Sequence, residues 1–258
     1  MRIIISPAKK MKIDTDSFDV TPLLFAEKTA RIQQTMQGMD DVALQKVWRC
    51  NDAIAATNIT RLRTMDLTCN RTPAILAYDG LQYTRMAPDV FTDHAFDYLS
   101  EHLRILSGFY GMLRPFDGVV PYRLEMQAKL AVGDCKDIYA YWGDTIAQTL
   151  WGETDLVLNL ASKEYSKVVT SFMAGYATPK RCVTCSFLEQ TADKLAEKGT
   201  LCKMARGEMV RFLAEEQITD LAGVCQFNVL GFAFSPEYSD ENRLVFIRNG
   251  NCCYSSKK

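Results

Sequence analysis

Two short segments combine polar and basic residues in a way that suits an anion. Ser6 and Lys9 directly follow the apolar run at residues 3–5. Polar residues at the end of a buried strand often line a cleft, so Lys9 could bind a phosphate to which Ser6 donates a hydrogen bond. Lys203 and Arg206 stand where a predicted strand passes into a predicted helix, whose first turn favours anions. Ordinary solvated turns or helix starts would explain both segments as well.

A third segment, residues 106–115, contains Gly108, Gly111 and Arg114. Glycines three residues apart permit a tight turn and close backbone approach to a ligand. In a helix-hairpin-helix element, such a turn presents N–H groups to one phosphate of DNA, and Arg114 would add charge beside it. From the residues alone we favour a simpler interpretation, in which Gly108 ends a helix and a turn follows. The glycines are one residue further apart than in the usual hairpin, and Pro115 limits a second helix.

Carboxylates accompany these basic residues. Arg123 and Glu125 are two apart in an alternating stretch, so they share one face of a predicted strand. Asn159 lies at the end of another predicted strand, and Glu164 and Tyr165 follow that strand. Together these side chains could line a polar pocket in which Glu125 or Glu164, with Tyr165, performs acid–base chemistry. The alternative is a structural ion pair, in which a glutamate orients an arginine.

The elements that must position these residues mix strands and helices without a regular rhythm. We predict strands at residues 2–5, 74–77, 122–129, 155–160, 182–188, 201–204, 227–232 and 243–247. We predict helices at residues 21–37, 92–107, 137–150 and 206–216, with short helices capped by Asp40 and Asn51. No repeat or linker interrupts this pattern, which predicts one mixed α/β (α+β) domain spanning residues 1–258.

The composition excludes several classes of protein. The chain has 258 residues, 30 Lys plus Arg, 31 Asp plus Glu, and 48% hydrophobic residues, which excludes a disordered chain and a polycation. Any basic surface must be local. We therefore expect Lys9, Arg114, Arg123, Lys203 and Arg206 to converge on one cleft, with the acidic residues elsewhere. Without a signal-peptide or membrane-span pattern, we expect a cytoplasmic protein with no membrane partner.

The metal-binding residue types are poorly arranged for a site. Cys182 and Cys185 lie three apart on a predicted strand, so their side chains point to opposite faces and we interpret them as buried structural cysteines. The only histidines, His94 and His102, are expected on the surface of one helix. We predict no metal and no cofactor.

Many short blocks of the sequence match one known family, in order and over nearly the whole chain. They include residues 4–9, 74–77, 83–84, 102–104, 106–108, 110–111, 113–115, 121–126, 142–144, 159–162, 164–165, 205–207 and 244–246. In these blocks the chain resembles the YaaA family of peroxide-stress proteins.

The resemblance implies a role in resistance to hydrogen peroxide and in limiting free iron. It also implies a DNA-binding protein with a single mixed fold, a positively charged cleft and a helix-hairpin-helix element. Transferred to this sequence, the candidate contacts to the DNA backbone are Lys9, Gly108, Gly111, Arg114, Arg123, Lys203 and Arg206. Met204 stands where the family usually has a basic residue, which reduces the local charge.

We therefore predict a peroxide-stress protein that binds duplex or junction DNA through a basic cleft, largely without sequence specificity. Its candidate DNA- or anion-binding residues are Ser6, Lys9, Gly108, Gly111, Arg114, Arg123, Asn159, Lys203 and Arg206. The alternative is an enzyme that acts on a nucleotide, nucleoside or other small anionic substrate, with Glu125, Glu164 and Tyr165 as catalytic candidates. A regulator that acts through a protein partner is a third possibility. The enzyme requires a deep pocket with a glutamate facing into it, whereas a DNA cradle requires an open basic groove.

Overall fold

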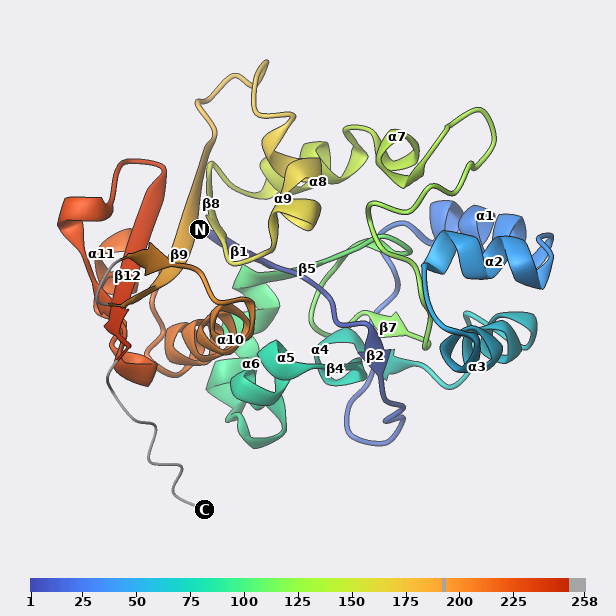
Figure 1. The fold of residues 1–258 in the computed structure, drawn as a ribbon, viewed down its shortest axis with the longest axis horizontal. Helices are drawn as coiled ribbons and strands as arrows, with labels where there is room; N and C mark the ends of the chain where they lie inside the picture. The colour runs from blue at the N-terminus through green and yellow to red at the C-terminus, as the bar shows by residue number, and fades with distance from the viewer. Residues whose placement is uncertain (192–193, 251–258) are drawn as a thin grey trace.

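A mostly parallel sheet crosses the molecule (Figure 1). The computed structural model describes residues 1–191 and 194–250. In order across the sheet, the strands are β11 (Ala233–Phe234), β12 (Arg243–Asn249), β9 (Arg181–Gln190), β8 (Leu156–Asn159), β1 (Arg2–Ile5), β5 (Leu103–Ser107) and β6 (Gly111–Leu113). The pairs from β12 to β5 are parallel, while β11 and β6 are antiparallel at the edges and β10 (Leu195–Ala196) pairs with β9. The central strand β1 buries Ile3, Ile4 and Ile5 completely, as expected of a strand covered on both faces.

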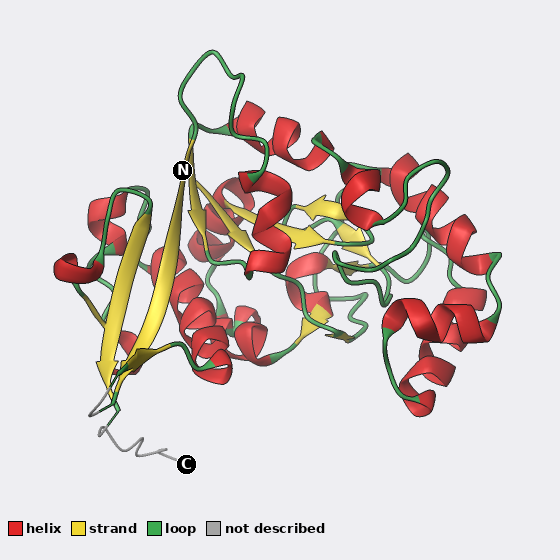
Figure 2. Cartoon of the chain, turned by 45° about the horizontal axis from the view of Figure 1, so that its top comes forward, coloured by secondary structure: helices red, strands yellow, loops and turns green. Residues whose placement is uncertain are grey.

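Helices cover both faces of this sheet (Figures 1 and 2). On one face lie α8 (Thr145–Glu153) and α9 (Lys163–Thr170). On the other lie α6 (Asp93–His102) and the long helix α10 (Gly199–Glu215), against which the short helix α5 (Leu81–Met86) packs. This arrangement confirms the mixed α/β fold.

Three helices form a separate group at one end of the molecule, namely α1 (Ala26–Gln37), α2 (Asp41–Trp48) and α3 (Asp52–Arg63). The side chains of Asp40 and Asn51 accept hydrogen bonds from the N–H groups of Ala43 and Ile54, so both predicted caps are confirmed. The remaining short elements are α4 (Ala74–Ala77), α7 (Ile138–Trp142), α11 (Leu221–Val224), η1 (Pro88–Val90), η2 (Val229–Gly231), η3 (Pro236–Tyr238), and the ladders of β2 (Lys10–Met11) with β4 (Tyr78–Asp79) and β3 (Thr72–Pro73) with β7 (Gly118–Val119).

The helix predicted over residues 92–107 is only partly correct. Helix α6 ends at His102, and the chain continues directly as strand β5. Every residue of β5 is buried. In the sequence its apolar residues continue the spacing of the apolar face of α6, which is why the helix was predicted to extend too far. Gly108 therefore lies in the turn between the antiparallel strands β5 and β6, and Gly111 is the first residue of β6, paired with Ser107. This is a β-hairpin, so the helix-hairpin-helix predicted at these glycines is wrong.

Other predicted elements also change type. Residues 74–77 form helix α4, and residues 201–204 lie within helix α10, although we predicted strands at both places. Residues 227–232 contain η2, and the strand follows them as β11. The helix predicted over 137–150 is two helices, because Gly143 separates them with a φ of +50°.

The stretch 122–129 is not a strand, yet its predicted alternation is correct. Leu124, Met126 and Ala128 are buried, whereas Gln127 and Lys129 are exposed. The chain is held by packing against the core rather than by a ladder of hydrogen bonds.

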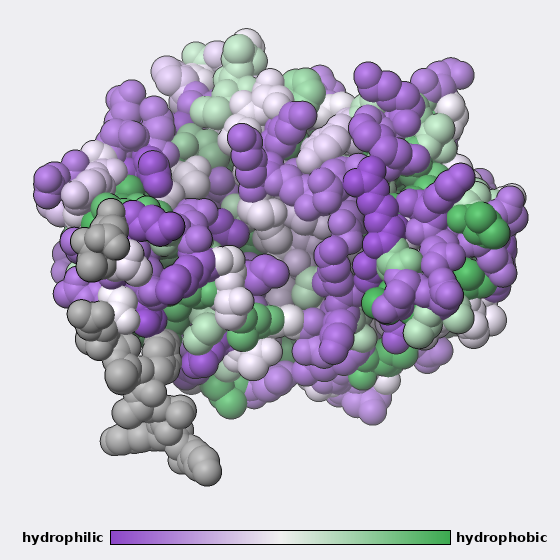
Figure 3. All heavy atoms as spheres, in the orientation of Figure 1, coloured by the Kyte–Doolittle hydropathy of each residue, from purple (hydrophilic) through white to green (hydrophobic). Residues whose placement is uncertain are grey.

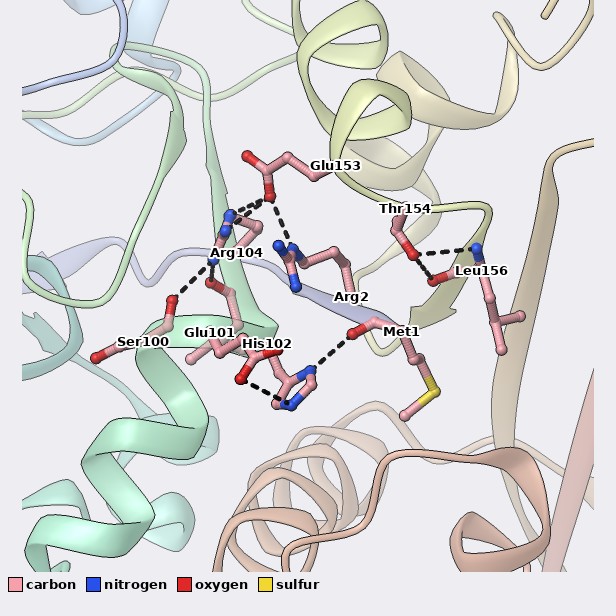
Figure 4. A network of polar contacts seen from close by, with 10 residues as sticks. Met1, Arg2, Ser100, Glu101, His102, Arg104, Glu153, Thr154 and Leu156 are labelled. Atoms are coloured by element: carbon pink, nitrogen blue, oxygen red, sulfur yellow. Dashed lines mark hydrogen bonds and ion pairs between the residues drawn. The ribbon is translucent and has the colours of Figure 1, made fainter. Parts of the chain in front are cut away.

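A polar network fastens the start of β1 to its neighbours (Figure 4). Glu153, the last residue of α8, accepts hydrogen bonds from Arg2 Nε at 2.8 Å and from Arg104 Nε at 2.9 Å. His102 is buried, although we expected it on the surface of its helix. Its Nδ1 lies 2.8 Å from the Met1 carbonyl oxygen. The network thus links β1, β5 and α8 at one edge of the sheet.

Within the described residues, no helix has the length and apolar character needed to cross a bilayer.

Helices α5 and α10 meet at Gly207 without room for a side chain. A Cβ at this position would lie 2.1 Å from the Gln82 carbonyl oxygen, whereas one at Gly152, also inside a helix, would have nothing within 4 Å. We expect Gly207→Ala to lower the free energy of unfolding by about 1–3 kcal/mol or more. The matched Gly152→Ala should raise it by roughly 0.5–1 kcal/mol, because alanine favours helix. Urea denaturation measures both, and equal stability of the two variants would contradict the packing described.

Candidate functional site

A pocket of about 370 Å³ opens at the edge of the sheet where β1 and β8 end. Five separate segments contribute to its wall: the loop after β1, the start of α5, the extended stretch around Glu125, the start of α9, and one face of α10. The lining residues are Ser6, Pro7, Ala8, Lys9, Lys10, Asp79, Gly80, Leu81, Gln82, Tyr83, Glu125, Ser162, Glu164, Tyr165, Lys203 and Arg206. Figure 3 shows a hollow near the middle of this face of the molecule, with hydrophilic residues around it.

Ser6 connects the segments that form this wall. Its Oγ accepts a hydrogen bond from the Ser162 backbone N–H at 2.8 Å, and its carbonyl oxygen accepts one from the Tyr83 hydroxyl at 3.0 Å. Because β1 and β8 are parallel neighbours, their ends bring Ser6 and Ser162 together. Ser6 therefore holds the start of α9 and the helix α5 against the end of β1.

Two carboxylates face the pocket in different surroundings. Glu125 Oε1 lies 2.6 Å from Lys9 Nζ and 3.7 Å from Arg123 Nη2. Glu164 is half-buried and accepts a hydrogen bond from the Gln127 N–H at 3.2 Å. Desolvation, assisted by the negative charge of Glu125, raises the pKa of Glu164 above its ordinary value. The two carboxylates thus lie in different surroundings, Glu125 beside two cations and Glu164 partly removed from water.

Buried tyrosines form the floor behind these carboxylates. Burial raises the pKa of Tyr165 far above its ordinary value, so its hydroxyl remains protonated and can act as a hydrogen-bond donor. Deeper in, the Tyr122 hydroxyl lies 3.0 Å from that of Tyr78 and 2.7 Å from Ser107 Oγ. These hydroxyls belong to the buried core rather than to the pocket lining, and burial raises the pKa of Tyr78 and Tyr122, so both remain protonated.

The basic residues of α10 contrast with Lys9. Lys203 and Arg206 are three apart on one helix, so they share a face and both line the pocket. Lys203 is exposed and Arg206 is half-buried. Among the residues that the structure describes, neither has a hydrogen bond or an ion pair, and Arg206 Nε is buried without a partner. They lie inside helix α10 rather than at a strand-to-helix junction, so the helix start predicted here is wrong.

The remaining candidate residues lie outside the pocket lining. Arg114 is paired with Asp117 at 2.8 Å and donates to the Pro22 carbonyl oxygen. Asn159 donates to Thr184 Oγ1 at 3.1 Å and accepts from the Ala161 N–H.

The glycines next to β5 serve close packing. A Cβ on Gly108 would lie 2.8 Å from the Leu124 carbonyl oxygen, directly below Glu125. Gly111 has a φ of +77° and is in contact with the Trp142 ring. Gly108 therefore lets the chain that carries Glu125 lie close to the core.

Charge in the pocket is mixed. Of the five cations expected to converge, Lys9, Lys203 and Arg206 line the pocket, whereas Arg114 and Arg123 do not. Asp79, Glu125 and Glu164 line the same cavity. The expectation that acidic residues lie away from the basic ones does not hold for this site.

Sequence reasoning missed the contribution of α5. Gln82 and Tyr83 line the pocket, and Asp79 and Gly80 precede them. The available signal was the Asp-Gly pair, which marks a turn, but a six-residue helix is too short to show a periodic pattern.

The cysteines of β9 are buried thiols, as expected. Burial raises the pKa of Cys182 to about 12 and that of Cys185 further, so both remain neutral. Within residues 1–191 and 194–250, no group of three or more His, Cys, Asp or Glu side chains is placed to hold a metal ion.

Comparison with known proteins gives one consistent match. The family model described as "Peroxide stress protein YaaA" matches residues 1–238. A UPF0246 protein of Desulfitobacterium hafniense is 50% identical over 249 residues, which cover 96% of this chain and 98% of that protein. A UPF0246 protein of Agathobacter rectalis is 47% identical over 250 residues, with 96% and 99% covered.

The carboxylate pair makes a measurable prediction. We expect the side-chain pKa of Glu164, followed by carbon-detected NMR, to lie above its ordinary value of 4.5. Glu125→Gln should lower it, since a negative charge is removed, and Lys9→Met should raise it further, since a positive charge is removed.

The raised pKa of Glu164 also makes the stability of the folded protein depend on pH. The folded state holds the Glu164 proton more tightly than the unfolded state, so stability is lost as pH rises from the ordinary pKa through the raised one. Glu164→Gln should remove that loss. An unshifted Glu164, or one insensitive to Glu125→Gln, would show that the two carboxylates are not coupled.

Proposed function

This chain belongs to the YaaA family of peroxide stress proteins, and on that premise we propose that it serves the peroxide response as an enzyme. Its substrate is a small anionic molecule of nucleotide or nucleoside type, bound in the pocket. Limiting oxidative damage and free iron, which the family resemblance implies, would follow from the conversion of that substrate.

One observation carries this proposal: the pocket encloses basic and acidic side chains together. Its volume of about 370 Å³ is within the roughly 300–1,000 Å³ typical of small-molecule sites. A site for the DNA backbone needs cations and N–H donors, whereas Glu125 and Glu164 would repel phosphates. Carboxylates beside cations instead suit a ligand that has an anionic group and hydroxyl or amino groups.

The chemistry that the side chains can perform is proton transfer. Glu164, with its raised pKa, can hold a proton and release it to a leaving group, or take one from a substrate hydroxyl. Glu125, held by Lys9 at 2.6 Å, can orient substrate hydroxyls or carry the negative charge that assists catalysis. The Tyr165 hydroxyl can donate a hydrogen bond to the substrate, since its pKa is raised.

DNA binding, the function that we predicted first from the sequence, remains a second candidate. It is favoured by the exposed side chains of Lys9, Lys10 and Lys203 at the pocket. These cations could contact phosphates of duplex or junction DNA without entering the pocket. In that case the pocket would either hold one nucleotide of the bound strand or stay unoccupied.

Turnover tests the enzyme directly. Wild-type protein incubated with nucleosides, nucleoside monophosphates and nucleoside diphosphates should convert at least one of them, as followed by mass spectrometry. Glu164→Gln should slow that conversion by about 10²–10⁴-fold, the usual contribution of general acid–base catalysis. Glu216→Gln, a change at an exposed glutamate outside the pocket, is the control and should leave the rate unchanged. No conversion of any of these compounds, or an unaffected Glu164→Gln variant, would refute the proposed reaction.

Salt dependence tests DNA binding. If the surface lysines and Arg206 hold the backbone, affinity for a duplex should fall steeply with salt, with a log–log slope of about −0.9 per phosphate contact. The double variant Lys9→Ala, Arg206→Ala should weaken binding equally on unrelated sequences and flatten the slope by about two contacts. Unchanged affinity in this variant would exclude the pocket face as the DNA-binding surface.

A further inference from the structure

An arginine without a carboxylate partner lines the pocket. Arg206 is half-buried, its Nε is inaccessible to solvent, and within the described residues its guanidinium makes no hydrogen bond or ion pair. Partly burying a charge without a partner is costly. Two other arginines differ in having a carboxylate near the guanidinium: Arg123 lies 3.7 Å from Glu125, although its Nε is also buried without a hydrogen bond, and Arg85 lies 3.7 Å from Glu208.

A second unsatisfied donor lies beside it. Gln82 is only 7% exposed, lines the same pocket, and its Nε2 has no partner within the described part of the chain. Buried amide donors are nearly always paired in folded proteins. Two unpaired donors in one pocket wall therefore indicate an acceptor that arrives with the ligand.

Close packing of the two helices keeps these donors together. Gly207, next to Arg206, lies against the Gln82 carbonyl oxygen, so α5 and α10 are in direct contact at this point. Binding of one anion by both residues requires the Nη atoms of Arg206 to face the pocket and the Gln82 side chain to rotate, because its Nε2 is buried in the free protein. Lys203, on the same face of α10, adds a positive charge at this end.

Other segments of the pocket lining contribute carboxylates. Glu125 and Glu164 come from different segments, and Glu125 already carries the ion pair with Lys9. The pocket lining thus combines unpaired donors on α5 and α10 with carboxylates at Asp79, Glu125 and Glu164.

We propose that Arg206 and Gln82 form a subsite for a single oxyanion, a phosphate or carboxylate group of the substrate, while Glu125 and Glu164 bind its uncharged, hydrogen-bond-donating end. This subsite rests on the proposed function, because it assigns the orientation of the substrate in the same pocket. It also adds Gln82 to the residues that determine specificity.

Calorimetry with matched probes tests the subsite. Wild-type protein should bind AMP about 10–100-fold more tightly than adenosine, since a charged hydrogen-bonded contact contributes that much. Arg206→Gln should abolish this preference, and Gln82→Leu should reduce it about 3–10-fold, as loss of one neutral hydrogen bond does. Arg211→Gln is the control on the same helix, where the arginine is paired with Glu215, and it should keep the preference.

Two further measurements separate binding from structure. Arg206→Gln should leave the melting temperature of the free protein unchanged or higher, because an unpaired charge is removed; a structural arginine would lower it. Inorganic phosphate and acetate, used as separate ligands, distinguish the two oxyanions, since only the matching one should raise the melting temperature of the wild type but not of Arg206→Gln.

The outcomes distinguish this subsite from the proposed enzyme. Equal binding of AMP and adenosine by the wild type, or an unaltered preference in Arg206→Gln, overturns the subsite even if the protein turns over a nucleoside. An AMP preference that depends on Arg206, without turnover of any substrate, supports the subsite and refutes the enzyme.

Discussion

The contact between α5 and α10 at Gly207 is the constraint on which the pocket depends. With a Cβ excluded at 2.1 Å from a backbone oxygen, the two helices cannot separate or slide without losing their packing. Helix α5 in turn follows β4, which pairs with β2 in the loop after β1, and its Tyr83 binds the Ser6 carbonyl oxygen. One close approach therefore fixes the position of α10 relative to the end of the central strand. The distances between side chains that face one another across the pocket therefore depend on the contact at Gly207.

Helices and strands were predicted correctly where the residue pattern was strong and matched the burial of those residues in the folded protein. The isoleucine run of β1 and the caps Asp40 and Asn51 needed no tertiary information. Errors occurred where burial on all sides removed the periodic signal. Leu103–Ser107 is buried throughout and looked like a continuation of α6, while residues 74–77, also fully buried, looked like a strand and form a helix. In both cases the apolar residues were identified correctly, but only packing decided their secondary structure.

The residues of the candidate site could be predicted from the sequence, but their pairing could not. Ser6, Lys9, Glu125, Glu164, Tyr165, Lys203 and Arg206 were all selected from the sequence, and the structure places them around one cavity. Their ion pairing could not be predicted, because it depends on distances between segments far apart in the chain. Lys9 is neutralised by Glu125, Arg114 by Asp117, and Arg206 by nothing among the described residues. The near balance of 30 basic and 31 acidic residues thus extends into the pocket itself, where a purely basic cleft was expected.

The position of β1 in the sheet has a consequence for how the protein is made. Arg2 pairs with Val157, and Ile3 lies between Leu103 and Leu158, so this strand has no neighbour in the sheet until a segment about a hundred residues further along the chain has been synthesised. At roughly 5–20 residues per second, a ribosome takes on the order of ten seconds to deliver β8. During that time an apolar, strand-forming segment is exposed outside the exit tunnel, where it can aggregate or bind a chaperone. The sheet can therefore close around β1 only late in synthesis, after β5 and β8 have both left the ribosome.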